Sequence, residues 1–425
     1  MQATDIFLLL LVAVVMLFGI GIMGFGFKIK TYSAQKPLKK AETATQVASQ
    51  EVVCMAFPQP IASHQADILT DGIKQNPTTH NKLKFEQPRF NGHTFANPVS
   101  FTTWVNPPSM RNFSTLLWTI SRWFDSANIP PQVELDRTLP VQCPIFDLQS
   151  ELSTTWLGHA TLFVHMDGIS FITDPVWSAC AAPFGYFFCP RYRPSPCSID
   201  QLPELHFSVI SHNHYDHLDL QAVRLLTKRF PKMRWFVPKG LKYCMNANTP
   251  QGTWIEELSW GQSVSFSCHG KSFEIWCTPA QHWSQRGICD RNYVLWSSWA
   301  VMGPKHKFYF TGDSGFCTAM FQNIGDQLGP FDLAAIPIGC YAPNWHPQHM
   351  DPVAAVQAHQ CIGATKSIAI HWGTYAMGST EPYLEPKIKL EAACQAAGLS
   401  DQDFVVLHHG QTWSIDPFTM KDCML

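Results

Sequence analysis

The fold is decided by the stretch His212-Asn213-His214-Tyr215-Asp216-His217-Leu218-Asp219, which follows the apolar run Phe207-Ser208-Val209-Ile210 and one serine. Imidazole suits divalent transition metals, and a carboxylate among the histidines favours a site that keeps a water or hydroxide. Ligands at this spacing cannot all face one metal. The stretch therefore predicts two adjacent metals, His212 and His214 on one, Asp216 and His217 on the other. Two metals roughly 3.5–4 Å apart clamp the attacking and leaving oxygens of a hydrolysis. The alternative is a solvated, His-rich turn without metal.

Composition excludes some classes of partner. The chain has 425 residues, of which 46% are apolar and 13% aromatic, so it can bury a large core in one or two domains. Its formal net charge is −2, and we expect no nucleic-acid partner, because surfaces that track phosphates carry a strong positive excess. The 14 cysteines include no Cys-x-x-Cys pair and lie mostly in apolar runs, as Cys277, Cys340 and Cys361 do, which indicates reduced core residues.

The N-terminal segment predicts a membrane anchor. The segment Ile6–Phe27 has 22 residues without a charge, enough to span a bilayer at about 1.5 Å per residue. No Lys or Arg precedes it, which argues against a cleaved signal peptide. Five basic residues follow it: Lys28, Lys30, Lys36, Lys39 and Lys40. We therefore expect a single-pass membrane protein whose catalytic domain faces the cytoplasm.

The rest of the chain divides by composition. Residues 31–51 are polar and small, as in a tether, and residues 52–110 mix Pro, Asn and isolated aromatics, as in an irregular arm. The predicted organisation is a transmembrane anchor at 1–30, a tether and arm at 31–88 and a hydrolase domain at 89–425. Apolar residues in 113–125 recur at the spacing of one helix face, which packs either on the core or on lipid.

Short apolar runs beyond residue 153 each end in a polar cluster with a ligand-type residue. The pairs are Phe207–Ile210 with His212, Phe273–Cys277 with His282, Phe308–Phe310 with Asp313, and Ser367–Ile370 with His371. Helical stretches at 219–229 and 351–361 alternate with these runs, which predicts an α/β fold whose ligands converge along one edge of its sheets. From the residues alone, His282 could be a satisfied, partly buried histidine, and Asp313 could equally cap a turn.

Longer strings around these residues resemble one branch of the metallo-β-lactamase superfamily. They are Trp156–Thr161, Thr173–Pro175, Ile210–Asp219, Arg234–Pro238, Gly312–Gly315, Gly329–Gly339 and Ile370–Thr374. The branch is the N-acyl-phosphatidylethanolamine-hydrolysing phospholipase D family, and the similarity runs from about Arg89 to near the C-terminus. The resemblance implies the metallo-β-lactamase αββα sandwich, here preceded by the single N-terminal transmembrane helix.

The resemblance also implies a set of site residues. His212, His214 and His282 would hold one zinc, Asp216, His217 and His371 would hold a second, and Asp313 would bridge the two. Asp216 and Asp313 would be the catalytic carboxylates, with Asp216 orienting the nucleophile. Gln348 and His349 resemble the family's phosphate-side contacts. Asp174 is a candidate to hold a ligand histidine from behind, and it could equally be a turn residue before Pro175.

The implied enzyme is a metal-dependent phosphoric diester hydrolase. It would use a zinc-bound hydroxide to hydrolyse N-acyl-phosphatidylethanolamine to N-acylethanolamine and phosphatidic acid at a membrane, as a homodimer. The His-x-Lys-x4-Asp route of the larger phospholipase D superfamily is excluded, because His80-Asn81-Lys82 and His269-Gly270-Lys271 lack the Asp. The alternatives are a superfamily lactonase or phosphoesterase with a small soluble substrate, and a tethered binding protein with a vestigial site.

Overall fold

Two seven-stranded sheets form the frame of the computed structural model, which describes residues 83–107, 129–182, 189–287, 289–343, 345–377 and 379–416. One sheet has the strand order β16-β3-β4-β5-β6-β7-β8, antiparallel from β16 to β5 and parallel from β5 to β8. Its strands are β3 (Leu152–Gly158), β4 (Thr161–Met166), β5 (Ile169–Thr173), β6 (Phe207–Val209), β7 (Arg234–Pro238), β8 (Ile255–Leu258) and β16 (Thr412–Ser414).

The other sheet has the order β15-β14-β13-β12-β11-β10-β9, antiparallel from β9 to β12 and parallel from β12 to β15. Its strands are β9 (Ser263–Cys268), β10 (Lys271–Thr278), β11 (Ser298–Met302), β12 (Lys307–Phe310), β13 (Phe331–Pro337), β14 (Ala364–Ile370) and β15 (Phe404–Val405). A separate two-stranded ribbon pairs β1 (Arg89–Phe90) with β2 (Phe95–Ala96).

The core lies between the two large sheets. Most of their strands are buried on both faces, which explains why they appear in the sequence as continuous apolar runs rather than alternating ones. Aromatic rings meet across the interface: Phe171 of β5 lies 5.4 Å from Phe308 of β12, and Phe207 of β6 lies 5.3 Å from Phe266 of β9, between ring centroids. These edge-to-face contacts fix how one sheet lies on the other.

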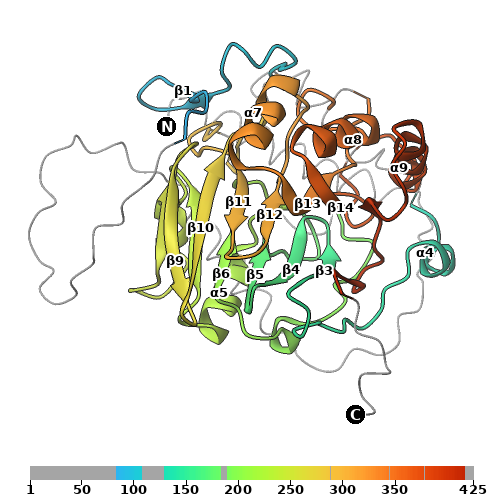
Figure 1. Cartoon of the computed structure of the whole chain (residues 1–425), viewed down its shortest axis with the longest axis horizontal. Helices are drawn as coiled ribbons and strands as arrows, with labels where there is room; N and C mark the ends of the chain where they lie inside the picture. The colour runs from blue at the N-terminus through green and yellow to red at the C-terminus, as the bar shows by residue number, and fades with distance from the viewer. Residues whose placement is uncertain are drawn as a thin grey trace, which may run out of the picture. The chain divides into compact units, whose positions relative to one another are not determined.

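Helices cover the outer faces of the sandwich (Figure 1). Helix α8 (Pro352–Cys361) packs on β13 and β14, with α7 (Thr318–Leu328) and α9 (Glu385–Ala396) beside it. On the other sheet, α6 (Lys242–Asn246) packs against β8 and α5 (Leu220–Arg229) against the short helix η2 (Ile199–Gln201). Helix α4 (Gln132–Thr138) precedes the first long strand. The predicted αββα arrangement is confirmed.

Two of the helices predicted from the sequence begin at side-chain caps. Asp219 accepts hydrogen bonds from the N–H groups of Gln221 and Ala222 at the start of α5, and Asp351 accepts one from Ala354 at the start of α8. Asp and Asn stabilise helix starts because they satisfy N–H groups that have no partner within the helix. The predicted helices at 219–229 and 351–361 are therefore confirmed to within one residue.

Some predictions fall on other parts of the chain. The apolar segment Ile6–Phe27, the tether and the helix at 113–125 lie outside the described residues. Within the described ranges, no helix has the length and apolar character that crossing a bilayer requires. The last residues of the predicted arm are described: Phe85 is buried, and Leu83 donates a hydrogen bond to the Gly261 carbonyl at 2.9 Å. The cysteines in the described ranges are free thiols.

Candidate metal centre

All seven predicted metal ligands come together along one edge of the sandwich. His212 follows β6, His282 follows β10, Asp313 follows β12 and His371 follows β14, so both sheets contribute. Six of the seven side chains are buried, and His214 is partly exposed. The ligand atoms fall into two groups, and within each group they lie within 4.8 Å of one another. A solvated, His-rich turn is thereby excluded.

The first group contains His212, His214, His282 and Asp313. Nδ1 of His214 lies 2.8 Å from Nε2 of His212 and 3.3 Å from Nε2 of His282. The Asp313 carboxylate lies 3.8 Å from His212 Nε2 and 3.7 Å from His282 Nε2. Nδ1 of His282 is 3.0 Å from the Gln348 carbonyl, and donating a proton there leaves Nε2 free to bind a cation.

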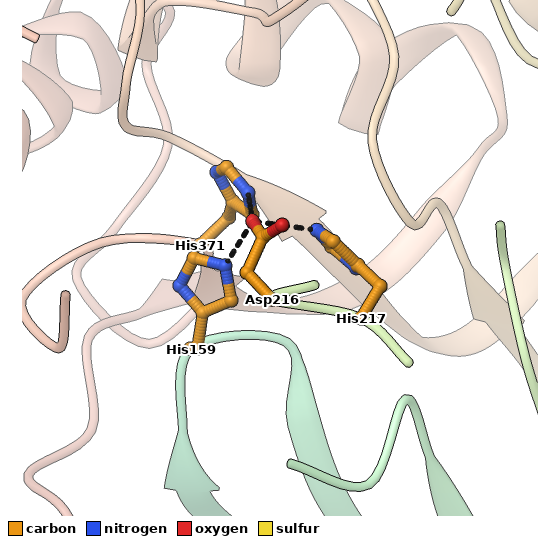
Figure 2. A group of neighbouring side chains, drawn as sticks. All are labelled: His159, Asp216, His217 and His371. Carbon is orange, nitrogen blue, oxygen red and sulfur yellow. Dashed lines mark hydrogen bonds and ion pairs between the residues drawn. The ribbon is translucent and has the colours of Figure 1, made fainter. Parts of the chain in front are cut away.

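The second group has Asp216 at its middle, as Figure 2 shows. One of its carboxylate oxygens, Oδ2, lies 2.9 Å from Nε2 of His159, 3.2 Å from Nε2 of His217 and 3.3 Å from Nε2 of His371. Three imidazoles around one carboxylate form a compact set of nitrogen and oxygen donors. Such a set suits a divalent transition metal.

Asp313 lies between the two groups. Its Oδ2 is 3.1 Å from Nε2 of His217, and its Oδ1 is 3.1 Å from Nε2 of His371. The same carboxylate faces His212 and His282 of the first group. A side chain in this position would be able to hold cations at both groups, in agreement with the predicted bridging role.

Burial keeps the first group in the form that binds metals. It lowers the pKa of His212 and His282 well below the ordinary value and that of His214 to about 4. These imidazoles are therefore neutral near pH 7 and offer lone pairs. Nε2 of His214 is buried and has no hydrogen-bond partner in the part of the chain that the structure describes.

The second group carries charges that a cation would balance. Burial raises the pKa of Asp216 and Asp313, but the neighbouring histidines together, His217 foremost, outweigh burial and hold both pKa values well below the ordinary one. Burial lowers the pKa of His217 and His371, but the neighbouring carboxylates together, Asp313 foremost, outweigh burial and raise both pKa values well above the ordinary one. Without metal, protons on these two rings balance the buried carboxylates. A divalent cation would replace the protons, so the residues fit a metal.

Asp174 holds His217 from behind. Its Oδ2 lies 2.6 Å from Nδ1 of His217 and accepts a hydrogen bond from Ser211 Oγ, and its Oδ1 accepts one from Ser211 N at 2.7 Å. The carboxyl is fully buried. This contact fixes the ring so that Nε2 faces Asp216 and Asp313, as the sequence-based interpretation of Asp174 requires.

We predict that Asp174→Asn weakens metal binding about 10–100-fold, since partners behind metal ligands have effects of this size. The amide nitrogen would place a donor against the proton on His217 Nδ1 or on Ser211, so the ring would lose its fixed orientation. Competition with a coloured chelator measures the affinity. The matched control is Asp200→Asn at an exposed position in η2, which should leave the affinity unchanged. Equal affinities in both variants would exclude this role.

Backbone strain gathers at the site. Four non-glycine residues here have positive φ: His159 (52°), Asp174 (32°), Cys340 (64°) and His371 (60°). Such conformations cost about 1–3 kcal/mol each and persist only where the surroundings impose them. At each of these positions the backbone turns sharply just after a strand, at the edge of the sandwich where the metal-ligand residues meet.

Gly312 permits a close approach beside Asp313. Its φ is +59°, and a Cβ there would lie 2.5 Å from the Cβ of Ser211. We predict that Gly312→Ala destabilises the protein by about 3 kcal/mol, from overpacking and backbone strain together, and lowers its metal content. The control is Gly252→Ala, where φ is +88° but nothing lies within 4 Å. Denaturant unfolding and metal analysis compare the two variants. Equal losses of stability and metal content would show that backbone strain alone, without the clash with Ser211, causes the effect.

The sequence-based site omitted His159. It belongs to the second group, and burial lowers its pKa to about 3. Its backbone is held by Thr374 Oγ1, which accepts from His159 N at 2.7 Å, and by His371 N, which donates to its carbonyl at 3.0 Å. His159 directly follows the end of β3, as His371 directly follows β14, but a single histidine after a strand did not distinguish it as a ligand.

The two predicted substrate contacts occupy different positions. His349 is part of the cluster: Nε2 lies 3.4 Å from Asp313 Oδ2, Nδ1 lies 2.6 Å from the Cys340 carbonyl, and its side chain is 13% exposed. Gln348 is only 2% exposed, and its amide donates to the Val105 carbonyl. Its own carbonyl orients His282. Gln348 thus supports the site structurally, and its contact with substrate stays a prediction.

A family model described as a beta-lactamase superfamily domain matches residues 170–372. That span includes every ligand-type residue of both groups except His159. Among solved structures, the chain resembles the metallo hydrolase Igni18 from the archaeon Ignicoccus hospitalis, with 21% identity and a TM-score of 0.45 over 62% of this chain and 99% of that one. This likeness is too distant to assign a function. The sandwich, the cluster at its edge and the family model define a metal-dependent hydrolase.

Two relatives identify the branch. N-acyl-phosphatidylethanolamine-hydrolyzing phospholipase D 1 of Caenorhabditis elegans is 47% identical over 352 residues, which cover 79% of this chain and 98% of the relative. The mitochondrial N-acyl-phosphatidylethanolamine-hydrolyzing phospholipase D of Saccharomyces cerevisiae is 31% identical over 282 residues, which cover 65% of this chain and 57% of the relative. The chain belongs to the N-acyl-phosphatidylethanolamine-hydrolysing phospholipase D family.

Proposed function

We propose that this chain is a two-zinc phosphodiesterase that hydrolyses N-acyl-phosphatidylethanolamine to N-acylethanolamine and phosphatidic acid. The observation that carries the proposal is the position of Asp313 between two buried groups of metal ligands. The names of the relatives in Caenorhabditis and Saccharomyces support the substrate class. His212, His214 and His282 would hold one zinc, and His217, His371, Asp216 and His159 surround the position of the other.

Two bound divalent cations would lower the pKa of a shared water and neutralise charge on the phosphoryl oxygens. The protein's own residues supply orientation. Asp216 accepts a hydrogen bond from His159, which holds its carboxylate among the imidazoles of the second group, where it would orient the nucleophile. His349 is more exposed than most of the cluster and lies 3.4 Å from Asp313, so it is placed to contact a phosphoryl group that enters there.

The test is to measure lipid products. Purified full-length protein with about two zinc per chain should release phosphatidic acid and N-acylethanolamine from vesicles that contain N-acyl-phosphatidylethanolamine, both identified by mass. A panel of lactones and soluble phosphodiesters, run in parallel, tests the alternative of a small substrate. Turnover of the panel without turnover of the vesicles would overturn the lipid assignment, and full lipid turnover by metal-free protein would overturn the mechanism.

We also propose that the segment Ile6–Phe27 anchors the enzyme in a membrane with the hydrolase domain on the cytoplasmic side. We propose further that the enzyme is a homodimer and does not bind nucleic acid. The uncharged length and the lysines that follow support the anchor. The full chain should enter the membrane fraction of cells, and a chain that lacks residues 1–30 should not. Protease added outside intact cells or organelles should leave the hydrolase domain uncut, and light scattering should give twice the mass of one chain.

A further inference from the structure

A second cluster of metal-ligand residues lies away from the active centre. It consists of His206, Cys268 and His269, whose ligand atoms lie within 4.8 Å of one another. His206 directly precedes β6, whereas His212 of the metal centre follows the same strand. Six residues of nearly extended chain separate two such positions by roughly 15–20 Å. The cluster is therefore a separate site at the opposite edge of the sheet.

The cluster joins the two sheets. Cys268 ends β9 and His269 begins the turn to β10, whereas His206 directly precedes β6 of the other sheet. His269 has φ of 49° and Gly270 has φ of 73°, so the turn directs its side chains away from the strand ladder. The imidazole rings of His206 and His269 meet edge to face with centroids 5.0 Å apart.

His206 presents a nitrogen without a partner. Its Nδ1 accepts a hydrogen bond from Ser170 N at 3.0 Å and lies 3.2 Å from the Ser170 carbonyl, so the backbone of β5 fixes the ring. Its Nε2 is buried and has no hydrogen-bond partner among the described residues. With Nδ1 accepting from Ser170 N, the neutral ring carries its proton on Nε2. A cation at Nε2 would shift that proton to Nδ1, where the Ser170 carbonyl at 3.2 Å accepts it. This is how backbone carbonyls orient histidines that bind metals.

Some charged groups around the cluster favour a bound cation and others disfavour it. Burial and the nearby Glu204 raise the pKa of the Cys268 thiol, and Glu204 also acts favourably on a positive charge at His206. Arg234 acts against a cation, but its guanidinium lies 3.8 Å from the centroid of the Trp254 ring. The ammonium of Lys271, opposite Cys268 in the strand pairing, donates to the Asp167 carbonyl at 2.7 Å. Both cations thus have partners of their own.

We propose that His206, Cys268 and His269 bind a zinc-class cation that clips the β9–β10 turn to the start of β6. Two imidazoles and a thiolate are nitrogen and sulfur donors, which select zinc or similar metals over calcium and magnesium. Ligand atoms around tetrahedral zinc lie about 3.5 Å apart, so the cluster must close by roughly 1 Å. The exposed His269 can make that movement. The bound metal displaces the thiol proton to solvent.

Cobalt(II) added to the reduced full-length protein tests the proposal. Among the described residues, the ligand groups of the active centre contain no cysteine, so a near-ultraviolet sulfur-to-cobalt charge-transfer band would report a thiolate outside those groups, as Cys268 is. The band should appear in the native protein, vanish in Cys268→Ser, and require at least about tenfold more cobalt in His269→Asn. Asn tolerates the left-handed conformation at this turn position, so that variant should fold.

Two further variants identify the thiol. Cys340 lies beside His371 in the metal centre, and Cys143 is exposed. The band should persist in Cys340→Ser and in Cys143→Ser. Absence of a band in the native protein, or a band that survives Cys268→Ser, would overturn the proposal. The cobalt band is measured without lipid hydrolysis, so this test of the second metal site is independent of the test of the proposed function.

Discussion

Asp313→Asn should lower kcat/KM for the lipid substrate by roughly 10³-fold, which corresponds to about 4 kcal/mol of lost transition-state stabilisation. The carboxylate faces ligands of both groups, at 3.8 Å from His212 and at 3.1 Å from His217 and His371. Asparagine keeps the shape but offers a single, neutral oxygen, so the two cations lose the negative charge between them. Metal analysis should show fewer than two zinc per chain, in parallel with the loss of turnover.

The control for this variant is Asp326→Asn, which removes an exposed carboxylate from α7. It changes the net charge by the same amount, and it should keep full activity and metal content. Circular dichroism separates loss of the site from loss of the fold. A fully active Asp313→Asn protein with two bound zinc ions would show that the bridge is dispensable.

Much of the fold was predictable because each buried strand appears in the sequence as a continuous apolar run. The runs before His212, His282, Asp313 and His371 became β6, β10, β12 and β14. Ends of strands from both sheets meet at one edge, so residues more than 150 positions apart in the sequence became neighbours: His371 lies 3.3 Å from Asp216. Spacing alone could not establish that proximity, which for His282 and Asp313 rested on the family resemblance.

Two features of the site could not be derived from sequence patterns. His159 follows β3 in the same way as the other ligand-type residues, but its single histidine in Trp156-Leu157-Gly158-His159 gave no count of ligands to suggest a role. The role of Gln348 could not be derived for a different reason. Its backbone carbonyl orients His282, and every residue type has such a carbonyl. Contacts of the main chain leave no trace in residue type, and only the folded geometry reveals them.

Removal of metal should have the second large effect: turnover should fall by roughly 10³-fold or more and return when zinc is added. Without metal, the pKa of water returns from near 7 toward about 15.7, and no nucleophile of comparable strength exists at neutral pH. The two ligand groups that the described residues form consist of histidine and aspartate side chains and contain no cysteine. Dialysis against a chelator, followed by addition of zinc, measures both steps.

Metal removal should also destabilise the folded state, and this effect distinguishes the centre from a site that matters for chemistry alone. A ligand that binds only the folded chain stabilises it by about 2.7 kcal/mol when its free concentration is 100 times its Kd. Two buried carboxylates would be left with imidazolium partners instead of divalent cations. The unfolding midpoint in denaturant should therefore fall on chelation and recover with zinc.

In Asp313→Asn the midpoint should respond less to zinc, because fewer cations bind. An equal response in the variant and the native protein would place the stabilising metal elsewhere, for which the cluster at Cys268 is the next site to examine.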